Sequence, residues 1–574
     1  MTGVDIHTER IDDVPLLLYF LQQMGIQEIF DSLVDPHGNR QGLSVGWLTS
    51  AWLSYIVSES DHRMSEVESW AEAQQEMLSE LIPQPVRSKD FTDDRLADVL
   101  SLLSDDKLWE EVESKLSERL IVVYDLEGSP VRVDSTTVSV YHDSEGNTLF
   151  RRGHSKDHRP DLAQFKVMLG SLDPMGMPLA TLVVSGDRAD DRLYIPAISK
   201  TRQSLGEGGR LYIGDCKMGS LENRVYVHAG GDYYLMPLAQ IGKASDLLKE
   251  LLDPVWKKAQ PLQRLYRETN NGDREVLALG FEIPRSQKAY QDGKLLVWQE
   301  RMLVVYSPSL ARRARRGFNK RLEKARDEIL WLTPPRRKGR KQFDDLDALQ
   351  KEVQRILKKH RVEGLLEVRY TREIQRRSIR KYRDRPACIR EKMRYVVEVS
   401  YNEEAIRKVR RTLGWRIYVT NAPKNVLPVE KAVLTYRQAP RIERNFSRLK
   451  GRPLGVHPLY VKRDNHACGM VRLLSLALRL LTLVEHEVRE GLKAAGETLS
   501  RLYAGNPKRK TDRPTTERLL KAFRGITLTV VHLPDQTIRH VTPLSQLQKR
   551  ILALLGLSTS IYEISDLSKD AIPP

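Results

Sequence analysis

The chain has 574 residues, of which 40% are hydrophobic, and a formal net charge of +17. This apolar content is sufficient for buried cores and excludes global disorder, and the length predicts three or four domains at about 150 residues each. The three cysteines, Cys216, Cys388 and Cys468, form no CxxC pair. They therefore exclude a disulfide framework and a cysteine-based structural zinc site, and they indicate a reducing cytosol. The N-terminal ten residues lack a signal-peptide pattern, so we expect a cytoplasmic protein.

The charge is distributed unevenly along the chain. Residues 1–130 contain 9 basic and 26 acidic side chains, whereas residues 301–400 contain 30 basic and 13 acidic side chains. Opposite charge in different segments indicates different partners. The basic middle and C-terminal parts suit a polyanion, whereas the acidic N-terminal part does not.

The acidic N-terminal part, residues 1–125, is predicted to be all-α. A helix-turn-helix that binds DNA ends is one interpretation, and a packing or self-association role, which the acidic balance favours, is the other. The predicted helices span residues 14–24, 43–56, 63–81, 92–103 and 105–120.

Two aspartates lie on or directly after predicted strands. Asp134 belongs to a strand-type run at residues 131–140, and Asp215 follows a short buried strand, residues 210–213, that Gly214 ends. A carboxylate at the end of a buried strand lies at the open edge of a sheet, where α/β sites form. The surrounding segments, taken together, predict an α/β sheet. They are a hairpin of residues 164–172 and 178–185, a helix at 190–203 and a strand at 233–237.

The stretch from Tyr436 to Lys450 contains one carboxylate, Glu443, among basic residues. One interpretation is a basic helix with an internal salt bridge. The other is a metal-binding carboxylate that acts on a phosphate backbone held by the basic side chains. Pro440 predicts a helix that begins at residue 439 or 440, so that Glu443 lies in its first turn. The basic residues of the stretch are Arg437, Arg441, Arg444, Arg448 and Lys450.

These blocks together resemble the DDE transposases of bacterial insertion sequences, in the cut-and-paste group with a Tyr-x2-Arg-x3-Glu-x6-Lys signature. Tyr436, Glu443 and Lys450 match that signature in register, whereas its Arg position is Ala439 here. Arg437 and Arg441 are candidates to replace the missing arginine, and we favour Arg437. The sequences VDST around Asp134, GD at Asp215 and GHSKDHRPDL at 153–162 are also similar to this group.

The resemblance implies an RNase H-like catalytic domain in which Asp134, Asp215 and Glu443 hold two Mg²⁺ ions, with Mn²⁺ able to substitute. The residues alone indicate phosphodiester cleavage, because hard cations prefer oxygen ligands. The resemblance adds transfer of the freed 3′-OH to target DNA. It also implies double-stranded DNA as partner (inverted repeats and target), a homodimer in the synaptic complex, no membrane and a nucleoid-associated place in a bacterial cytoplasm. A metal-dependent nuclease without strand transfer and a non-catalytic regulator derived from a transposase are the alternatives.

The segment between Asp215 and Glu443 is far longer than one helix needs, so we expect an inserted domain. Its predicted strands are 275–283, 295–306, 365–374 and 395–401, and its predicted helices are 309–332 and 343–359. The fold class is therefore α/β, with the catalytic domain interrupted by a β-rich (α+β) insertion, an all-α N-terminal domain and a helical C-terminal part. The expected domains are 1–125 (helical), 126–242 (catalytic, first part), 243–412 (basic insertion), 413–500 (catalytic, second part) and 501–574 (tail).

The loop at residues 153–162 has three interpretations. His154 and His158 have the spacing of a zinc pair, Lys156 and Arg159 are suited to phosphate contacts, and the loop is otherwise a solvated one. Gly153 and Pro160 oppose the helix that a zinc pair needs. In the insertion, phosphate contact is favoured over a solvated face because the arginines are so dense. The full set of expected DNA-binding residues is Tyr436, Arg437, Arg441, Arg444, Lys450, Lys156, Arg159, Arg312, Arg313, Arg315 and Arg316.

The C-terminal third contains the most apolar run, residues 470–484. Arg472 and Arg479 interrupt it, so it is predicted to be part of a buried helix, residues 465–488, and not a membrane span. A strand at 415–420 is expected to return the chain to the catalytic sheet. The tail predicts short strands at 525–532 and an amphipathic helix at 545–555, for which we expect a packing role only.

Overall fold

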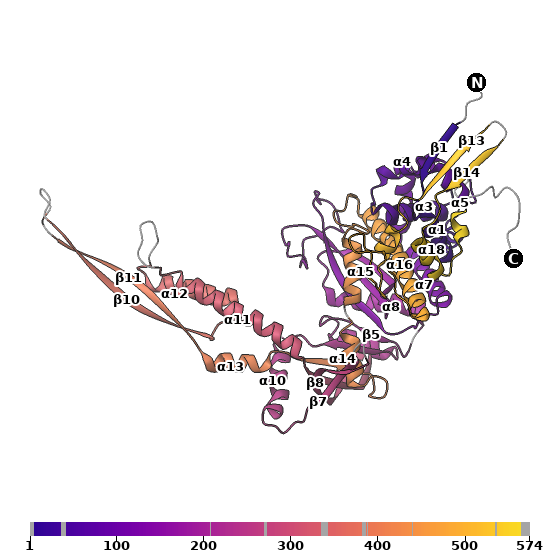
Figure 1. The fold of residues 1–574 in the computed structure, drawn as a ribbon. Coiled ribbons are helices and arrows are strands. Elements are labelled where there is room, and N and C mark those ends of the chain that lie inside the picture. Colours follow the sequence, from indigo (N-terminus) through magenta and orange to yellow (C-terminus); the bar gives the residue numbers. More distant parts are fainter. Residues whose placement is uncertain are drawn as a thin grey trace.

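The computed structural model describes residues 5–35, 42–206, 208–240, 242–268, 272–334, 343–380, 386, 388–438, 440–533 and 536–563. It is a mixed α/β fold with one large sheet and many helices, as predicted. A body contains both described ends of the chain, and a long arm extends from it (Figure 1).

The large sheet has nine strands in the order β4-β3-β2-β5-β6-β12-β9-β8-β7. Strand β2 pairs antiparallel with β3 and parallel with β5, and β5 pairs parallel with β6. The predicted strands are confirmed, whereas the RNase H-like assignment stays a prediction. The bounds are β2 Val131–Ser139, β3 Gln164–Leu172, β4 Met177–Ser185, β5 Leu211–Ile213, β6 Tyr233–Pro237, β7 Gln263–Glu268, β8 Arg274–Gln291, β9 Lys294–Tyr306 and β12 Trp415–Thr420.

Helix α16 (Asp464–Ala495) passes through the main core, and the N-terminal helices α1, α3 and α6 pack against it. It is long and apolar enough to span a membrane, but 94% of its most apolar window is buried in the protein. Its two interrupting arginines have partners. Arg479 forms a buried ion pair with Glu113 (2.6 Å), and Arg472 donates to the carbonyl oxygen of Leu103 (2.9 Å). The helix is therefore a core helix, as predicted.

The remaining helices of the body include the predicted ones, with the predicted helix 63–81 divided in two, and others that the sequence did not indicate, such as α2, α9, α10 and α17. The polar segment at 505–515 contains no helix or named strand among the described residues. The bounds are α1 Val14–Gln23, α2 Ile26–Leu33, α3 Val45–Glu59, α4 Val67–Glu72, α5 Gln75–Leu81, α6 Asp93–Ser104, α7 Asp106–Val123, α8 Tyr194–Leu205, α9 Leu221–Ala229, α10 Lys243–Trp256, α14 Val429–Tyr436, α15 Pro440–Lys450, α17 Thr516–Lys521 and α18 Gln546–Leu554.

The N-terminal part is not all-α, and that expectation was wrong. Strand β1 (Asp5–Arg10) pairs antiparallel with β13 (Thr527–His532), which also pairs with β14 (Thr537–Val541). The sequence DIHTER has little apolar character, and only Glu9 of this strand is buried. Its strand conformation comes from backbone pairing with a segment at the other end of the chain, which no local pattern reveals.

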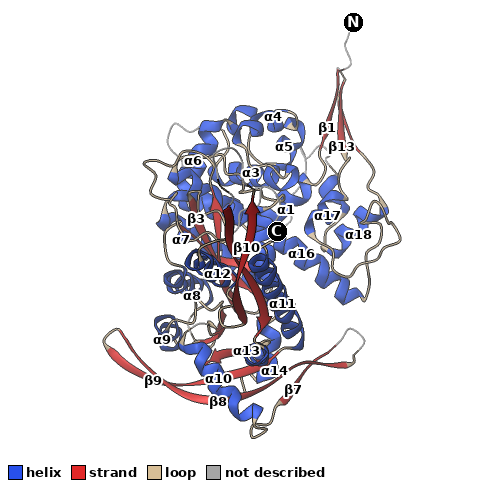
Figure 2. Cartoon of the chain, turned by 90° about the vertical axis from the view of Figure 1, so that its left-hand side faces the viewer, coloured by secondary structure: helices blue, strands red, loops and turns tan. Residues whose placement is uncertain are grey.

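The segment expected as one inserted domain, residues 243–412, is divided between two places. Strands β7, β8 and β9 extend the large sheet, whereas the later elements form the arm around a separate core (Figure 1; Figure 2). The arm consists of α11 Pro308–Leu330, α12 Leu346–His360, β10 Leu366–Ile379, β11 Cys388–Tyr401 and α13 Glu403–Thr412. The predicted helices and strands of the segment are present, and its boundaries as a domain stay a prediction.

Candidate active site

Asp134 and Asp215 lie close together on the neighbouring strands β2 and β5 of the large sheet. In the parallel pair β2–β5, Arg132 lies opposite Ile213. Asp134 lies two residues after Arg132, and Asp215 lies two residues after Ile213. The register of the parallel pair therefore places the two carboxylates side by side. Burial and the neighbouring charge of Asp215 raise the pKa of Asp134, whereas Lys156 opposes the increase. Two acids thus interact electrostatically, Asp134 within the buried strand β2 and Asp215 just beyond the end of the short strand β5.

Tyr194, on α8, fixes the position of Asp215. Its hydroxyl group donates to Asp215 Oδ1 (2.7 Å), and the backbone N–H of Lys217 donates to the same oxygen (2.7 Å). No described residue donates a hydrogen bond to Asp215 Oδ2. Burial and the charges of Asp215 and Asp134 raise the pKa of Tyr194, so this hydroxyl group stays protonated and acts as a donor.

Helix α15 positions Glu443 and begins at Pro440, as predicted. Its buried side chains Ile442, Phe446 and Leu449 belong to the main core, and it packs against β2. Asn445, also buried, donates to the carbonyl oxygen of Gly176 in the β3–β4 turn (2.6 Å). Glu443 itself is exposed in the first helical turn, where a carboxylate is favoured by the helix dipole.

The two aspartates fit a divalent cation, because a cation would offset the effects of burial and of the neighbouring charge of Asp215, which raise the pKa of Asp134. Among the described residues, no group of three or more His, Cys, Asp and Glu side chains is close enough to hold a metal ion. The structure therefore brings together Asp134 and Asp215 but does not include Glu443 in one cluster with them. The same finding applies to the zinc interpretation of His154 and His158, which gain no third ligand.

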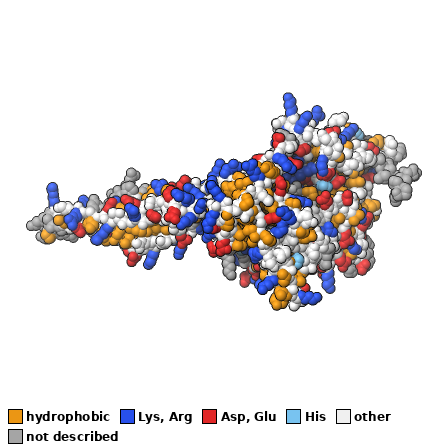
Figure 3. All heavy atoms as spheres, turned by 90° about the horizontal axis from the view of Figure 1, so that it is seen from below, with side chains coloured by type: hydrophobic (Ala, Val, Ile, Leu, Met, Phe, Trp, Pro, Cys, Tyr) orange, Lys and Arg blue, Asp and Glu red, His pale blue; other side chains and the backbone are white. Residues whose placement is uncertain are grey.

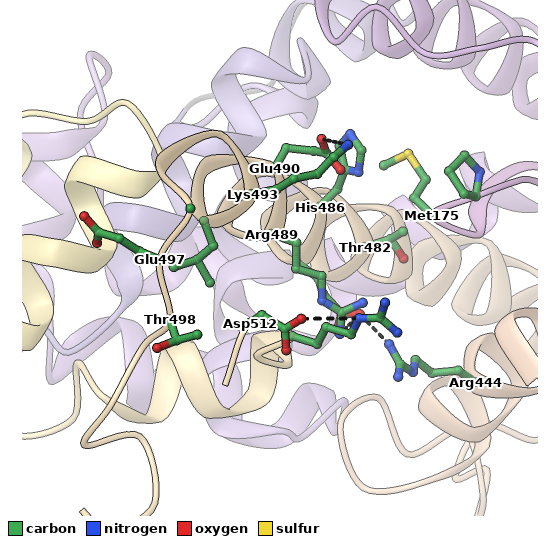
Figure 4. Close-up of a pocket in the computed structure, with 15 residues that line it drawn as sticks. Met175, Arg444, Thr482, His486, Arg489, Glu490, Lys493, Glu497, Thr498 and Asp512 are labelled. Carbon is green, nitrogen blue, oxygen red and sulfur yellow. Dashed lines mark hydrogen bonds and ion pairs between the residues drawn. The ribbon is translucent and has the colours of Figure 1, made fainter. Parts of the chain in front are cut away.

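Three basic residues of α15 have partners within the protein. Arg444 pairs with Glu485 of α16, and Arg448 pairs with Glu485 and with Glu517. Lys450 Nζ contacts both carboxylate oxygens of Asp157, at 2.7 and 2.8 Å. Arg444 also lines a pocket beside α16 (Figure 4), which none of the three predicted catalytic carboxylates lines.

Tyr436 and Arg437 are half-buried. The ring of Tyr436 lies 4.8 Å from that of Tyr418, and burial raises the pKa of Tyr436. Arg437 donates to Ser307 Oγ (2.8 Å), which caps the arm helix α11, and to the carbonyl oxygen of Leu277 (3.3 Å). Arg437 is thus engaged within the protein and is not a freely exposed side chain. Ala439 and the side chain of Arg441 lie outside the described residues.

The other expected DNA contacts differ in exposure. Lys156 points toward the acidic site, and Arg159 pairs with Asp161 (2.7 Å). Arg312, Arg313, Arg315 and Arg316 on α11 are all exposed and form no ion pair with a described residue. Figure 3 shows Lys and Arg side chains along the arm and where it joins the body. The role of all these residues as DNA contacts stays a prediction.

Tyr194 and the inward orientation of Lys156 were missed in the sequence. Tyr194 follows an ordinary polar segment, and nothing in its spacing to Asp215 indicates a contact. Lys156 lies in a block whose resemblance was noted, but its partner Asp134 is on another element. Both contacts depend on how the loop and helix fold against the sheet.

Comparison with known proteins identifies the family of the chain. None of the curated proteins compared with the chain matches it. A cryo-EM structure of the piggyBac transposase synaptic complex with hairpin DNA has 9% sequence identity and a TM-score of 0.33, covering 89% of this chain and 79% of that chain. The family model of the transposase DDE domain matches residues 127–480, which include both aspartates, the arm and Glu443. The chain therefore belongs to the transposase DDE domain family.

Proposed function

We propose that this protein is a Mg²⁺-dependent transposase that binds the terminal inverted repeats of its element, hydrolyses phosphodiester bonds at the ends and joins the 3′-OH groups to target DNA. The observation that carries the proposal is the register of β2 and β5, in which Asp134 and Asp215 follow the same residue pair by two positions within the family-matched region. The strand order around β2 supports an RNase H-like catalytic domain.

Asp134 and Asp215 would hold the metal, with Glu443 as the third carboxylate from the helix that packs against β2. Bound Mg²⁺ supplies activation of the attacking water and stabilisation of the leaving 3′ oxygen. Tyr194 holds Asp215 through Oδ1 and leaves Oδ2 as an available ligand atom. Glu443, which forms no cluster with the aspartates among the described residues, would have to approach them to complete the set.

The exposed arginines of α11 are suited to the phosphate backbone of duplex DNA, because they are unpaired among the described residues and surrounded by solvent. A homodimer in the synaptic complex, an origin in a bacterial insertion sequence and a nucleoid-associated place in the cytoplasm complete the proposal. They rest on the sequence resemblance alone.

Exchange of each carboxylate for its amide tests the metal assignment. Asp134→Asn, Asp215→Asn and Glu443→Gln should each abolish Mg²⁺-dependent end cleavage while DNA binding persists, because each loses a metal ligand at almost constant size. Glu145→Gln, an exposed carboxylate in another loop, is the matched control and should cleave normally. A variant that cleaves near the wild-type rate removes that residue from the assignment.

Strand joining separates the proposal from its two alternatives. Protein, Mg²⁺ and pre-cleaved ends with free 3′-OH groups should yield joined products with a supercoiled plasmid. Cleavage without joining indicates a nuclease, and DNA binding without cleavage indicates a transposase-derived regulator. The inverted repeats that flank the protein's own gene are the substrate of choice.

A further inference from the structure

Two adjacent residues of the 153–162 loop contact opposite sides of the acidic site. Lys156 Nζ lies 3.5 Å from Asp134 Oδ1, and it donates to Ser135 O (2.6 Å) and Ser135 Oγ (2.9 Å). Asp157 accepts from Lys450 Nζ with both oxygens. One side chain therefore contacts the strand that carries Asp134, and the next contacts the helix that carries Glu443.

The loop is anchored so that both contacts are held in place. Ser155 is buried, and its hydroxyl group accepts from the backbone N–H groups of Asp157 (3.3 Å) and Arg159 (3.2 Å). The backbone N–H of Lys156 donates to Thr137 Oγ1 of β2 (3.1 Å). A Cβ atom at Gly153 would lie 2.3 Å from the carbonyl oxygen of Gly186, so the loop approaches the neighbouring backbone as closely as glycine allows.

Lys156 carries a positive charge, as a metal ion does, and Asp157 carries a negative charge, as a DNA phosphate does. Metal ion and phosphate are the two ligands that the proposed site would bind. An ammonium group next to Asp134 offsets part of the repulsion from Asp215, as a divalent cation does. A carboxylate that binds the Lys450 ammonium group through two oxygens makes the same contact as a phosphate. The Lys156 and Asp157 side chains remain 31% and 35% exposed, so water and ions reach both contacts. Ion pairs with this exposure contribute little free energy, so a stronger partner can displace either side chain from its contact.

We propose that Lys156 and Asp157 are positioning residues that substitute for the divalent cation and for a DNA phosphate in the free protein, and that both contacts open when metal and DNA bind. This inference rests on the proposed function. It reassigns Lys156 from a DNA contact to a competitor of the metal. In this inference, Lys450 contacts the scissile DNA strand only after its ion pair with Asp157 has opened.

The DNA side is tested without metal, by fluorescence anisotropy of a labelled DNA duplex in EDTA. Asp157→Asn should bind the duplex about two- to fivefold more tightly than wild type, which is what removal of one partly exposed competing ion pair is worth. Glu145→Gln removes the same charge from a loop where it has no basic partner among the described residues, and it should give a smaller change. In a Lys450→Met background, Asp157→Asn should give no gain, because the lysine that it frees is gone.

The metal side is tested without DNA, by calorimetric titration of Mn²⁺ into the protein. Lys156→Met should bind Mn²⁺ about two- to fivefold more tightly, because the competing ammonium group is removed. Lys156→Arg keeps the charge and should restore wild-type affinity. Circular dichroism and thermal unfolding of each variant establish that it is folded before its affinity is compared.

Three outcomes would overturn the inference. The first is weaker DNA binding by Lys156→Met in EDTA, which would make Lys156 a direct DNA contact. The second is a gain in DNA affinity for Asp157→Asn that is no larger than that of Glu145→Gln. The third is unchanged or weaker Mn²⁺ binding by folded Lys156→Met. Failure of the wild-type protein to bind any duplex would instead contradict the proposed function itself, so the two failures are distinguishable.

Discussion

Arginines of the arm helix α11 and of the core helix α16 have opposite surroundings. Arg312, Arg313, Arg315 and Arg316 are exposed and have no ion-pair partner among the described residues. Arg479 of α16 is fully buried, pairs with Glu113, and lies 5.9 Å from the centre of the Trp109 ring. The comparison shows that the fold compensates the charge of some arginines internally and leaves that of others exposed. The net charge of a segment is therefore a weaker guide to DNA binding than the exposure of its arginines.

The largest expected effect on stability lies in the core. Arg479→Met should lower the free energy of unfolding by about 3–5 kcal/mol, because Glu113 would remain buried without its partner. Denaturant unfolding measures this change. The double variant Arg479→Met with Glu113→Leu should recover most of the stability, since both charges are then absent. A single variant as stable as wild type would contradict the buried pair.

A smaller effect concerns a buried acid that has no such compensation. Asp13, buried and hydrogen-bonded by Ser58 Oγ (2.5 Å), has its pKa raised to about 6, chiefly by burial. Because the folded-state pKa is raised, the stabilisation by protonated Asp13 is present below about pH 4 and is lost as the pH rises through about 6. Asp13→Asn should therefore raise the free energy of unfolding by about 1–3 kcal/mol at pH 8, at about 1.4 kcal/mol for each unit of pKa difference. At pH 4 the variant and wild type should unfold alike, and a gain that does not depend on pH would refute this cause.

Arg437 is half-buried, between the exposed arginines of α11 and the fully buried Arg479. It joins the base of the arm to the end of α14. Arg437→Ala should lower the free energy of unfolding by about 1 kcal/mol through loss of its hydrogen bond to Ser307. It should also reduce end cleavage more than Arg441→Ala, if Arg437 replaces the signature arginine that is Ala439 here. Cleavage by both variants, measured side by side, decides the question. A larger defect in Arg441→Ala reverses the assignment.

The smallest stability effect is expected on the arm. Replacement of Arg312, Arg313, Arg315 and Arg316 by Gln should change the free energy of unfolding by at most about 0.5 kcal/mol per residue, because exposed side chains contribute little. The slope of log K for DNA against log salt should flatten by up to about 0.9 for each phosphate that an arginine no longer neutralises. Quadruple replacement of other exposed basic residues of the body is the control. An unchanged slope would place the DNA elsewhere.

The sequence by itself determined most local elements and the strands on or after which the two aspartates lie. Strand-type residues predicted β2 with Asp134, a short apolar run ended by Gly214 predicted the strand before Asp215, and Pro440 predicted where the helix of Glu443 begins. The density of arginines in the segment that forms α11 predicted phosphate contacts, and the structure shows these arginines exposed. These features depend on neighbours in the chain, so periodicity, proline and charge are sufficient to reveal them.

Only the tertiary structure decided which distant segments pair. It set the register that aligns Asp134 with Asp215, and it paired β1 with β13 at the other end of the chain. It added β7–β9 to the large sheet, so the segment expected as one insertion is divided in two. It also brought Lys156 to Asp134 and Asp157 to Lys450. Strand partners and ion pairs are chosen by the free energy of the whole packed chain, and a local pattern carries no information on which of many compatible partners that packing selects.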